Sequence, residues 1–149
     1  MTPIFRKILS PIQFNDPNSL AGLDLAQRLA SPTKARIFLL HVMPSTLIIP
    51  DLPGYCDLFA TDEGAVRQEL EKLAATHLRD VVYEIVVKTG DPAAMIQLAA
   101  QELGTDVIIM PTHGRRGLSH FFMGSVAEKV VREAPCMVLT IRPELVQKN

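Results

Sequence analysis

The chain has 149 residues, of which 48% are hydrophobic and 21% are charged, a composition typical of one compact globular domain. Its 15 basic and 16 acidic side chains leave a formal net charge of −1, so bulk charge draws it neither to nucleic acid nor to anionic membranes. The N-terminal stretch holds no long apolar run and is broken by Pro11, so we expect no signal peptide and no membrane span. Two cysteines, Cys56 and Cys136, are too few for a disulfide framework and predict reduced thiols in a cytoplasmic protein.

Short apolar runs alternate along the chain with segments in which apolar residues recur every three or four positions, which predicts alternating strands and helices. The first helix is expected to begin at the cap-and-proline pair Asp16–Pro17 and to end at Ser31–Pro32, and Gly104 is well placed to end the third. The expected strands are Ile4–Ser10, Ala35–Met43, Val81–Lys88, Val107–Met110 and Cys136–Arg142, and the other helices are Thr61–Leu78, Asp91–Leu103 and Ser125–Glu133.

The composition of two further segments predicts a loop and an edge strand. Pro44–Ala60 holds three prolines and no period, which predicts a long loop. In the expected strand Val81–Lys88, the polar residues Glu84 and Lys88 fall on one face, which favours an edge or half-exposed position in the sheet.

Strands separated by helices need right-handed crossover connections, and these produce a parallel sheet with helices on both faces. We therefore predict an α/β fold, a three-layer α-β-α sandwich that forms a single domain over residues 1–149. Ligands bind such sheets beyond the carboxyl ends of the strands, where residues 10–15, 41–44 and 110–125 would meet.

Residues 107–132 combine an apolar strand, a glycine-bearing loop and a helix start. The first N–H groups of a helix have no partner within the helix, and the helix dipole adds partial positive charge there, so the loop points toward an anionic ligand such as a nucleotide. Gly114 and Gly124 either let phosphate approach the backbone or are turn glycines in a left-handed conformation. Ser125 and Glu128 have the spacing of a capping box.

Other polar residues near this edge have two interpretations each. Arg115 and Arg116 either neutralise phosphate or belong to a solvated loop. His41 and His113 either act as a general base or shape the loops through backbone partners, and the second is favoured because the sequence pairs neither with a nucleophile or carboxylate. The sequence contains no Walker, metal-ligand, Ser-His-Asp or nucleic-acid motif.

Three segments resemble the universal stress protein family: KILSPIQFNDP its opening strand and turn, LLHVMP its second strand, and MPTHGRRGLSHFFMGSVAEKVVREAPCMVL its nucleotide loop, last helix and last strand. The resemblance covers nearly the whole chain and implies an adenine-nucleotide α-hydrolase-like sheet with strand order 3-2-1-4-5. It also implies a homodimer in which the last strands, residues 136–142, pair antiparallel across a two-fold axis, and the apolar sequence of this strand fits a covered edge.

In ATP-binding members the loop reads glycine, two residues, glycine, nine residues, and then glycine with serine or threonine. Gly114, Gly124 and Ser125 match this pattern, but Pro111 stands at the first glycine and offers no N–H. Gln13 stands where these members typically carry an aspartate that contacts the nucleoside. The resemblance thus implies a degenerate site for ATP or another adenine nucleotide, with Mg²⁺ only alongside the nucleotide and no other cofactor or metal. The implied site residues are Pro11, Ile12, Gln13, Val42, Met110, Pro111, Gly114, Arg115, Gly124, Ser125 and Val126.

These residues support binding of a ligand rather than its turnover. We therefore expect a dimeric regulatory or stress-response protein that is not an enzyme and that binds neither nucleic acid nor membrane. Two alternatives stay open: a nucleotide-independent dimer of the same fold that binds a protein partner, and a slow ATP hydrolase or phosphotransferase. The absence of an evident catalytic carboxylate in the loop sequence weighs against the second alternative.

Overall fold

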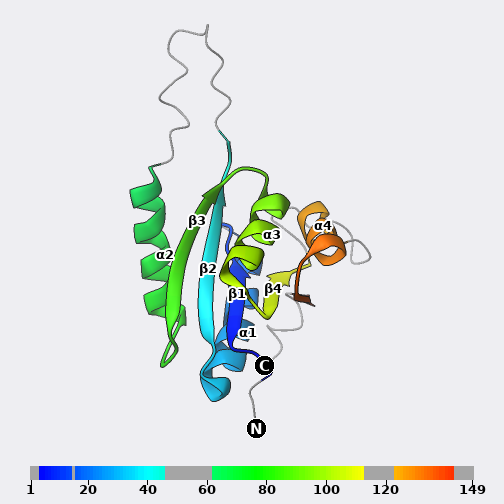
Figure 1. Ribbon diagram of the computed structural model, residues 1–149. Coiled ribbons are helices and arrows are strands. Elements are labelled where there is room, and N and C mark those ends of the chain that lie inside the picture. The colour runs from blue at the N-terminus through cyan, green and yellow to red at the C-terminus, as the bar shows by residue number, and fades with distance from the viewer. Residues whose placement is uncertain (1–3, 15, 46–61, 113–122, 143–149) are drawn as a thin grey trace, which may run out of the picture.

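The computed structural model describes residues 4–14, 16–45, 62–112 and 123–142. Strands and helices alternate through these residues (Figure 1). In chain order they are β1 (Lys7–Pro11), α1 (Pro17–Thr33), β2 (Arg36–Met43), α2 (Glu63–His77), β3 (Tyr83–Thr89), α3 (Pro92–Leu103), β4 (Val107–Pro111), α4 (Ser125–Glu133) and β5 (Met137–Ile141).

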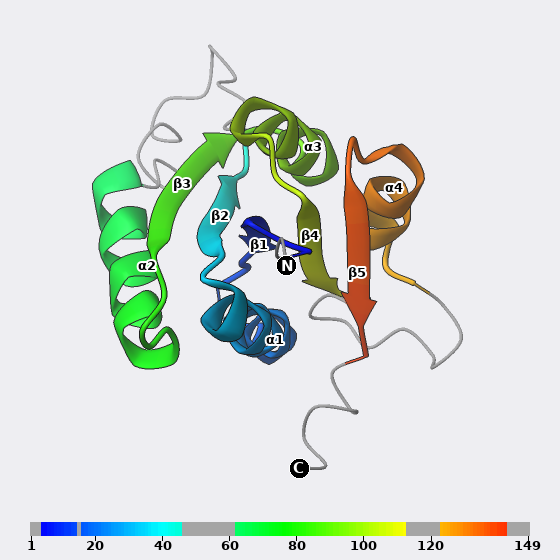
Figure 2. The same ribbon diagram turned by 60° about the horizontal axis from the view of Figure 1, so that its bottom comes forward.

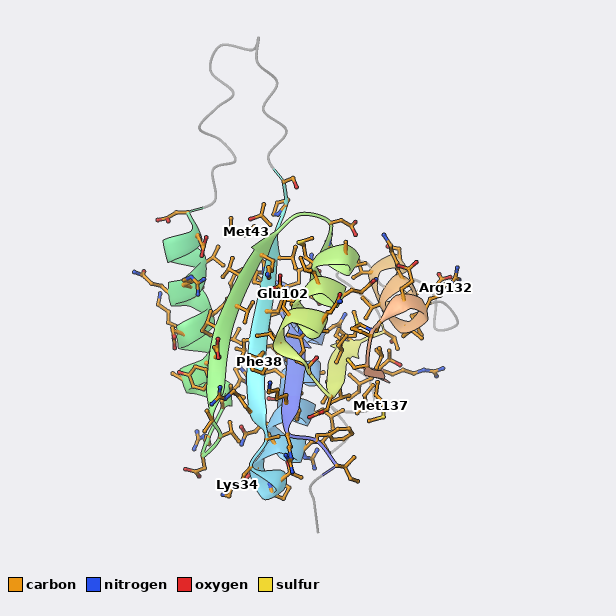
Figure 3. The ribbon with its side chains drawn as sticks, in the orientation of Figure 1. Lys34, Phe38, Met43, Glu102, Arg132 and Met137 are labelled. Atoms are coloured by element: carbon orange, nitrogen blue, oxygen red, sulfur yellow. The ribbon has the colours of Figure 1, made fainter. Side chains whose placement is uncertain are left out.

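The strands form one five-stranded sheet in the order β3-β2-β1-β4-β5, and every neighbouring pair is parallel. This confirms the predicted α/β fold and the strand order that the family resemblance implied. Because all strands run the same way, Pro11, Met43 and Pro111 all end strands at one edge of the sheet. In Figure 3, Met43 marks this edge at the upper end of β2, while Lys34 lies at the opposite end of the molecule.

Figure 2 shows α1 and α2 against one face of the sheet and α3 and α4 against the other. Alternate residues of β1 serve the two cores: Ile8 packs with the helices of the first face and Leu9 with those of the second. Both residues are fully buried, as are Leu39 and Ile108 in the neighbouring strands. Burial on both faces explains why the central strands are continuous apolar runs rather than alternating patterns.

The predicted helix starts of α1 and α3 are confirmed. The side chain of Asp16 accepts from Asn18 N at 3.0 Å, and that of Asp91 accepts from Ala94 N at 2.9 Å, with a proline next in each helix. Aspartate at the N-cap satisfies amides that the helix itself cannot. Gly104 ends α3 with a φ of 59°, as its position after Leu103 predicts.

The predicted end of α1 at Ser31–Pro32 is wrong, because the helix continues through Pro32 to Thr33. A proline in a last helical turn removes one donor, but here other groups satisfy neighbouring carbonyls. The Thr33 hydroxyl donates to Leu29 O at 2.7 Å, and Ala35 N donates to Ala30 O at 3.2 Å. Lys34 then ends the helix in the left-handed region at a φ of 57°.

Several other boundaries shift by a few residues. The first strand begins at Lys7 rather than Ile4, whose side chain is 79% exposed and has no core to join. The predicted β3 is confirmed as an edge strand with a half-buried pattern, although it begins at Tyr83. The predicted loop Pro44–Ala60 lies outside the described residues apart from its first two positions.

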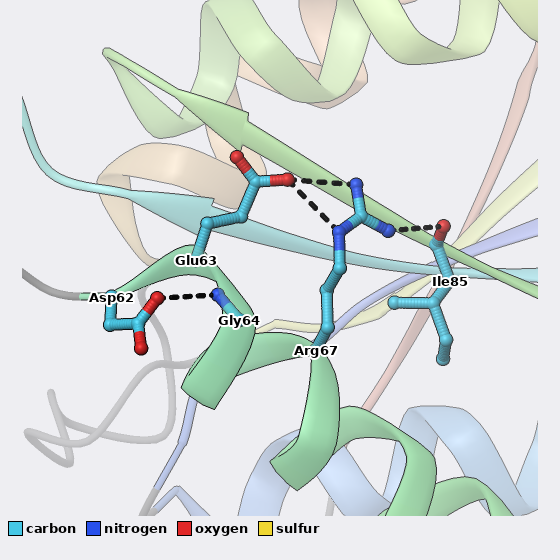
Figure 4. Close-up of polar contacts among 5 residues, drawn as sticks. All are labelled: Asp62, Glu63, Gly64, Arg67 and Ile85. Atoms are coloured by element: carbon cyan, nitrogen blue, oxygen red, sulfur yellow. Dashed lines mark hydrogen bonds and ion pairs between the residues drawn. The ribbon is translucent and has the colours of Figure 1, made fainter.

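The start of α2 shows how this edge strand is tied to its helix (Figure 4). Asp62 caps the helix by accepting from Gly64 N at 2.8 Å. Arg67 forms an ion pair with Glu63 at 2.9 Å and donates to the Ile85 carbonyl oxygen of β3 at 3.5 Å. A charged side chain over an edge carbonyl discourages unwanted strand pairing there.

We expect Gly22→Ala and Gly22→Leu to change stability in opposite directions, because α1 lies close to β4 at this residue. A Cβ on Gly22 would lie 3.5–3.6 Å from Ile109 O, Met110 Cα and Pro111 Cδ, which is ordinary contact. Alanine should therefore stabilise by up to about 1 kcal/mol through helix propensity. Leucine should destabilise by about 1–3 kcal/mol through overpacking. Urea unfolding of the three proteins measures both effects, and a leucine variant as stable as wild type would contradict the close approach.

Candidate functional site

A pocket of about 860 Å³ lies at the carboxyl edge of the sheet. The ends of β1, β2 and β4 form its floor, and α1, α3 and α4 all begin at its walls. Gly114 and Arg115 lie outside the described residues. The structure gathers every other predicted site residue around this one pocket: Pro11, Ile12, Gln13, Val42, Met110, Pro111, Gly124, Ser125 and Val126.

The turn after β1 is held by backbone hydrogen bonds. Ile12 N donates to Leu40 O at 2.7 Å, which ties the turn to β2. Gln13 N donates to the Ser19 hydroxyl at 3.0 Å, and Gln13 O accepts from Asp16 N at 3.3 Å. The backbone of Gln13 is thus engaged by the start of α1, so its exposed side-chain amide is the part of this residue that can reach a ligand.

His41 also has a structural partner at this edge. Its Nδ1 lies 2.9 Å from the Ile12 carbonyl oxygen, and its ring packs on Phe14 with the ring centroids 4.4 Å apart. The backbone partner expected for His41 is therefore present. His113, for which the sequence left the same alternatives, lies outside the described residues.

Gly124 adopts a φ of −61° and a ψ of 152°, an extended conformation open to any residue. The left-handed alternative considered from the sequence is therefore wrong for this glycine. Its N–H donates to Thr112 O at 2.7 Å, and Thr112 N donates to Ile141 O at 2.9 Å, which holds the start of α4 beside the ends of β4 and β5. What distinguishes glycine at this position is its lack of a side chain at the pocket wall.

The predicted capping box of Ser125 and Glu128 is also wrong. Gly124 occupies the N-cap position, where it has no side chain to cap the helix, and Ser125 is already the first helical residue. The Glu128 side chain instead binds Arg132 at 2.7 Å, a pairing one turn along the helix that competes with the backward reach of a capping box. Among the described residues, the first amides of α4 are therefore left without a side-chain cap at the pocket.

The charged residues at the pocket are only partly predictable from the sequence. Asp91, which the sequence predicts only at the start of a helix, lines the pocket, and Lys129 Nζ lies 3.5 Å from its Oδ2. The hydrogen bond from Ala94 N, and then the charge of Lys129, hold the pKa of Asp91 below its ordinary value, so it is ionised at neutral pH. The predicted site lacks Asp91 because it draws on the segments after the first, second and fourth strands, whereas α3 begins over the same edge.

The described ranges hold neither a metal cluster nor a membrane-spanning helix. No three His, Cys, Asp or Glu side chains among residues 4–14, 16–45, 62–112 and 123–142 are grouped to hold a metal ion. In the same ranges, each helix is too short or too polar to cross a membrane.

A parallel sheet with a pocket where its strand order reverses, between β1 and β4, defines a doubly wound α/β protein with a ligand site at the switch point. The model of the Universal stress protein family matches residues 4–142. The chain therefore belongs to the universal stress protein family, as its loop and strand motifs predicted.

Individual relatives are similar over different lengths. The chain is 30% identical to Universal stress protein YxiE of Bacillus subtilis, over 93% of this chain and 100% of that protein. It is 40% identical to a putative universal stress protein of Staphylococcus haemolyticus, but over only 44% of this chain and 41% of that protein.

Solved structures of the family share the fold at low sequence identity. Universal stress protein UspA from Lactobacillus plantarum superposes with a TM-score of 0.76 at 23% identity, over 91% of this chain and 97% of that one. The universal stress protein from Archaeoglobus fulgidus in complex with dAMP gives 0.67 at 19%, over 93% and 99%. A universal stress protein in complex with cAMP gives 0.63 at 17%, over 93% and 98%.

Proposed function

We propose that this protein is a dimeric regulatory protein of the cytoplasm that binds an adenine nucleotide reversibly in the pocket at the carboxyl edge of its sheet. The observation that carries the proposal is the start of α4. Its first residues line the pocket, and the N-cap residue Gly124 has no side chain to cap their amides or to block the approach to them. An uncapped helix N-terminus with a glycine before it suits a phosphate group.

The remaining walls of the pocket suit a nucleoside. Ile12, Val42, Met110 and Ile96 offer apolar surface for a base, while the side chain of Gln13 offers a donor and an acceptor. Two solved relatives are complexes with cAMP and with dAMP, which supports an adenine nucleotide as the class of ligand. Mg²⁺ would enter only with a nucleotide that carries several phosphates.

The engagement of the titratable groups supports binding without turnover. Among the described residues that line the pocket, these groups are Asp16, His41 and Asp91. Asp16 and Asp91 accept from helix amides, and His41 Nδ1 is bonded to the Ile12 carbonyl oxygen. Because each of the three is engaged in this way, we assign them structural roles rather than general-base catalysis.

Two residues favour a second candidate function, a partner-binding dimer that needs no nucleotide. Gln13 lacks the charge of the aspartate typical of ATP-binding members, and Pro111 lacks an N–H. A lost hydrogen bond costs about 0.5–1.5 kcal/mol, or about 1.5–3 kcal/mol when one group is charged. Together these losses amount to on the order of tenfold to a thousandfold in affinity.

The double change Gln13→Asp with Pro111→Gly should therefore tighten ATP binding by on the order of tenfold or more. Calorimetric titration of wild type and the double variant with ATP measures the difference, and native mass spectrometry of the purified protein reports nucleotide carried through purification. If wild type binds ATP tightly and the double change does not improve binding, Gln13 and Pro111 do not lower the affinity for nucleotide. No binding by either protein would favour the partner-binding dimer.

A further inference from the structure

The charge of the pocket bears on how many phosphates its ligand carries. Among the described residues that line the pocket, the charged side chains are Asp16 and Asp91, and both are carboxylates. Lys and Arg are absent from that described lining. Such a surface is unfavourable for polyanions except where a specific feature compensates.

The compensating feature is confined to one of the helices that begin here. Asp16 satisfies an amide at the start of α1 and Asp91 one at the start of α3, so these two N-termini are already neutralised by carboxylates. Within the described ranges, the start of α4 carries no such cap. In the described part of the pocket, the start of α4 is therefore the helix N-terminus that remains available to bind a phosphate group.

Asp91 lines the same pocket as the start of α4. Its Oδ2 is 3.5 Å from Nζ of Lys129, which is on α4 one turn beyond Ser125, and α3 and α4 lie side by side on the same face of the sheet (Figures 1 and 2). The Asp91 side chain is 59% exposed, so its charge lies at the rim of the pocket. Repulsion between this carboxylate and a phosphate chain depends on distance rather than on direction, and each further phosphoryl group increases it.

From this arrangement we infer that the pocket selects a nucleoside monophosphate over a nucleoside triphosphate, and that Asp91 is the residue that sets this selectivity. The inference rests on the proposed nucleotide-binding function and gives its ligand class. Lys129 moderates the effect, because its ammonium group offsets part of the Asp91 charge. The size of the effect is modest, since the carboxylate is exposed and screened by solvent.

The test is calorimetric titration of the full chain with AMP and with ATP at low ionic strength and without divalent cations. Wild type should bind AMP about threefold to tenfold more tightly than ATP. Asp91→Asn should reduce this ratio to about one by tightening ATP, because asparagine caps a helix as well as aspartate but carries no charge. Lys129→Gln should widen the ratio, because it leaves the Asp91 charge without its partner.

Asp62→Asn is the matched control. Asp62 caps α2 through Gly64 N and does not line the pocket, so its replacement removes an equivalent charge from an equivalent cap and should leave the AMP-to-ATP ratio unchanged (Figure 4). A wild-type protein that binds ATP as tightly as AMP, or an unchanged ratio in Asp91→Asn, would overturn the inference while leaving the proposed function intact. Failure of every nucleotide to bind would overturn the proposed function and this inference with it.

Discussion

Gly124→Val should abolish adenine-nucleotide binding and leave the protein folded. Valine adopts the extended conformation of Gly124, at a φ of −61° and a ψ of 152°, without backbone strain. Its two methyl groups, however, would occupy the space in front of the Ser125 and Val126 amides, where the phosphate is proposed to bind. Valine is a poorer N-cap than glycine, so we expect a loss of about 1 kcal/mol in stability, too little to unfold a domain of this size.

Gly124→Ser separates loss of the phosphate site from loss of stability. Serine is a strong N-cap, and its hydroxyl would accept from the same α4 amides that glycine leaves free. We therefore expect this variant to be at least as stable as wild type and yet to bind nucleotide more weakly. Calorimetric titration with AMP and urea unfolding give the two quantities for each protein. Full-strength binding by either variant would place the phosphate away from the start of α4.

Much of the fold could be predicted because its local determinants agree with its packing. The run at β2 is apolar because Ile37 and Phe38 face different helix layers, and an apolar run of that length between two helical periods is typical of a strand covered on both faces. The helix caps were predictable for the same reason. Asp16 and Asp91 satisfy amides of their own helices, so neighbouring residues alone reveal their role.

The errors at two helix ends occurred where a nearby residue that the pattern does not include decides the outcome. The helix α1 runs past Pro32 to Thr33, and the Thr33 hydroxyl and Ala35 N satisfy the neighbouring carbonyls of Leu29 and Ala30, which a rule about proline alone does not weigh. The capping box failed because Glu128 pairs with Arg132 and the helix begins after Gly124 rather than after Ser125. The proline at the helix end and the spacing of the capping box are both present in the sequence. In each case, a side chain within one helical turn forms a competing interaction of similar strength.

The site was predictable to the extent that parallel strands end at a common edge. That rule alone brought Gln13, Val42 and Gly124 together from three distant parts of the chain. It did not include Asp91, because β3 is an edge strand and α3, which follows it, starts over the pocket only after crossing to the other face. Crossover geometry of this kind comes from the sheet order, which the residues around Asp91 do not encode.

Leu139→Lys should convert a dimeric protein into a monomer, because we expect the dimer to form through β5. This strand lies at the end of the sheet, where Met137 is 55% and Leu139 is 38% exposed, and Figure 3 shows Met137 at this side of the molecule. Val138 between them packs into the core, so the two exposed side chains share the opposite face of the strand. Exposed apolar side chains on an edge strand favour pairing with another strand.

In a dimer with a two-fold axis, Leu139→Lys changes the interface twice, so its effect on the stability of the dimer doubles. In an isologous contact each subunit contributes Leu139, so one substitution removes two leucines and places two lysines in one interface. Because Leu139 is 38% exposed before it is covered, the lost apolar burial is worth about 1–2 kcal/mol per dimer, or on the order of tenfold in the dissociation constant. Repulsion between the two lysines and the cost of removing their charges from water weaken the dimer further, so we expect monomers at micromolar concentration in light scattering. Val82→Lys is the control, because Val82 is also exposed but precedes β3 at the far end of the sheet, and its dimer should persist. A monomeric wild type would refute the dimer, whereas a dimer that survives Leu139→Lys would place the interface away from β5.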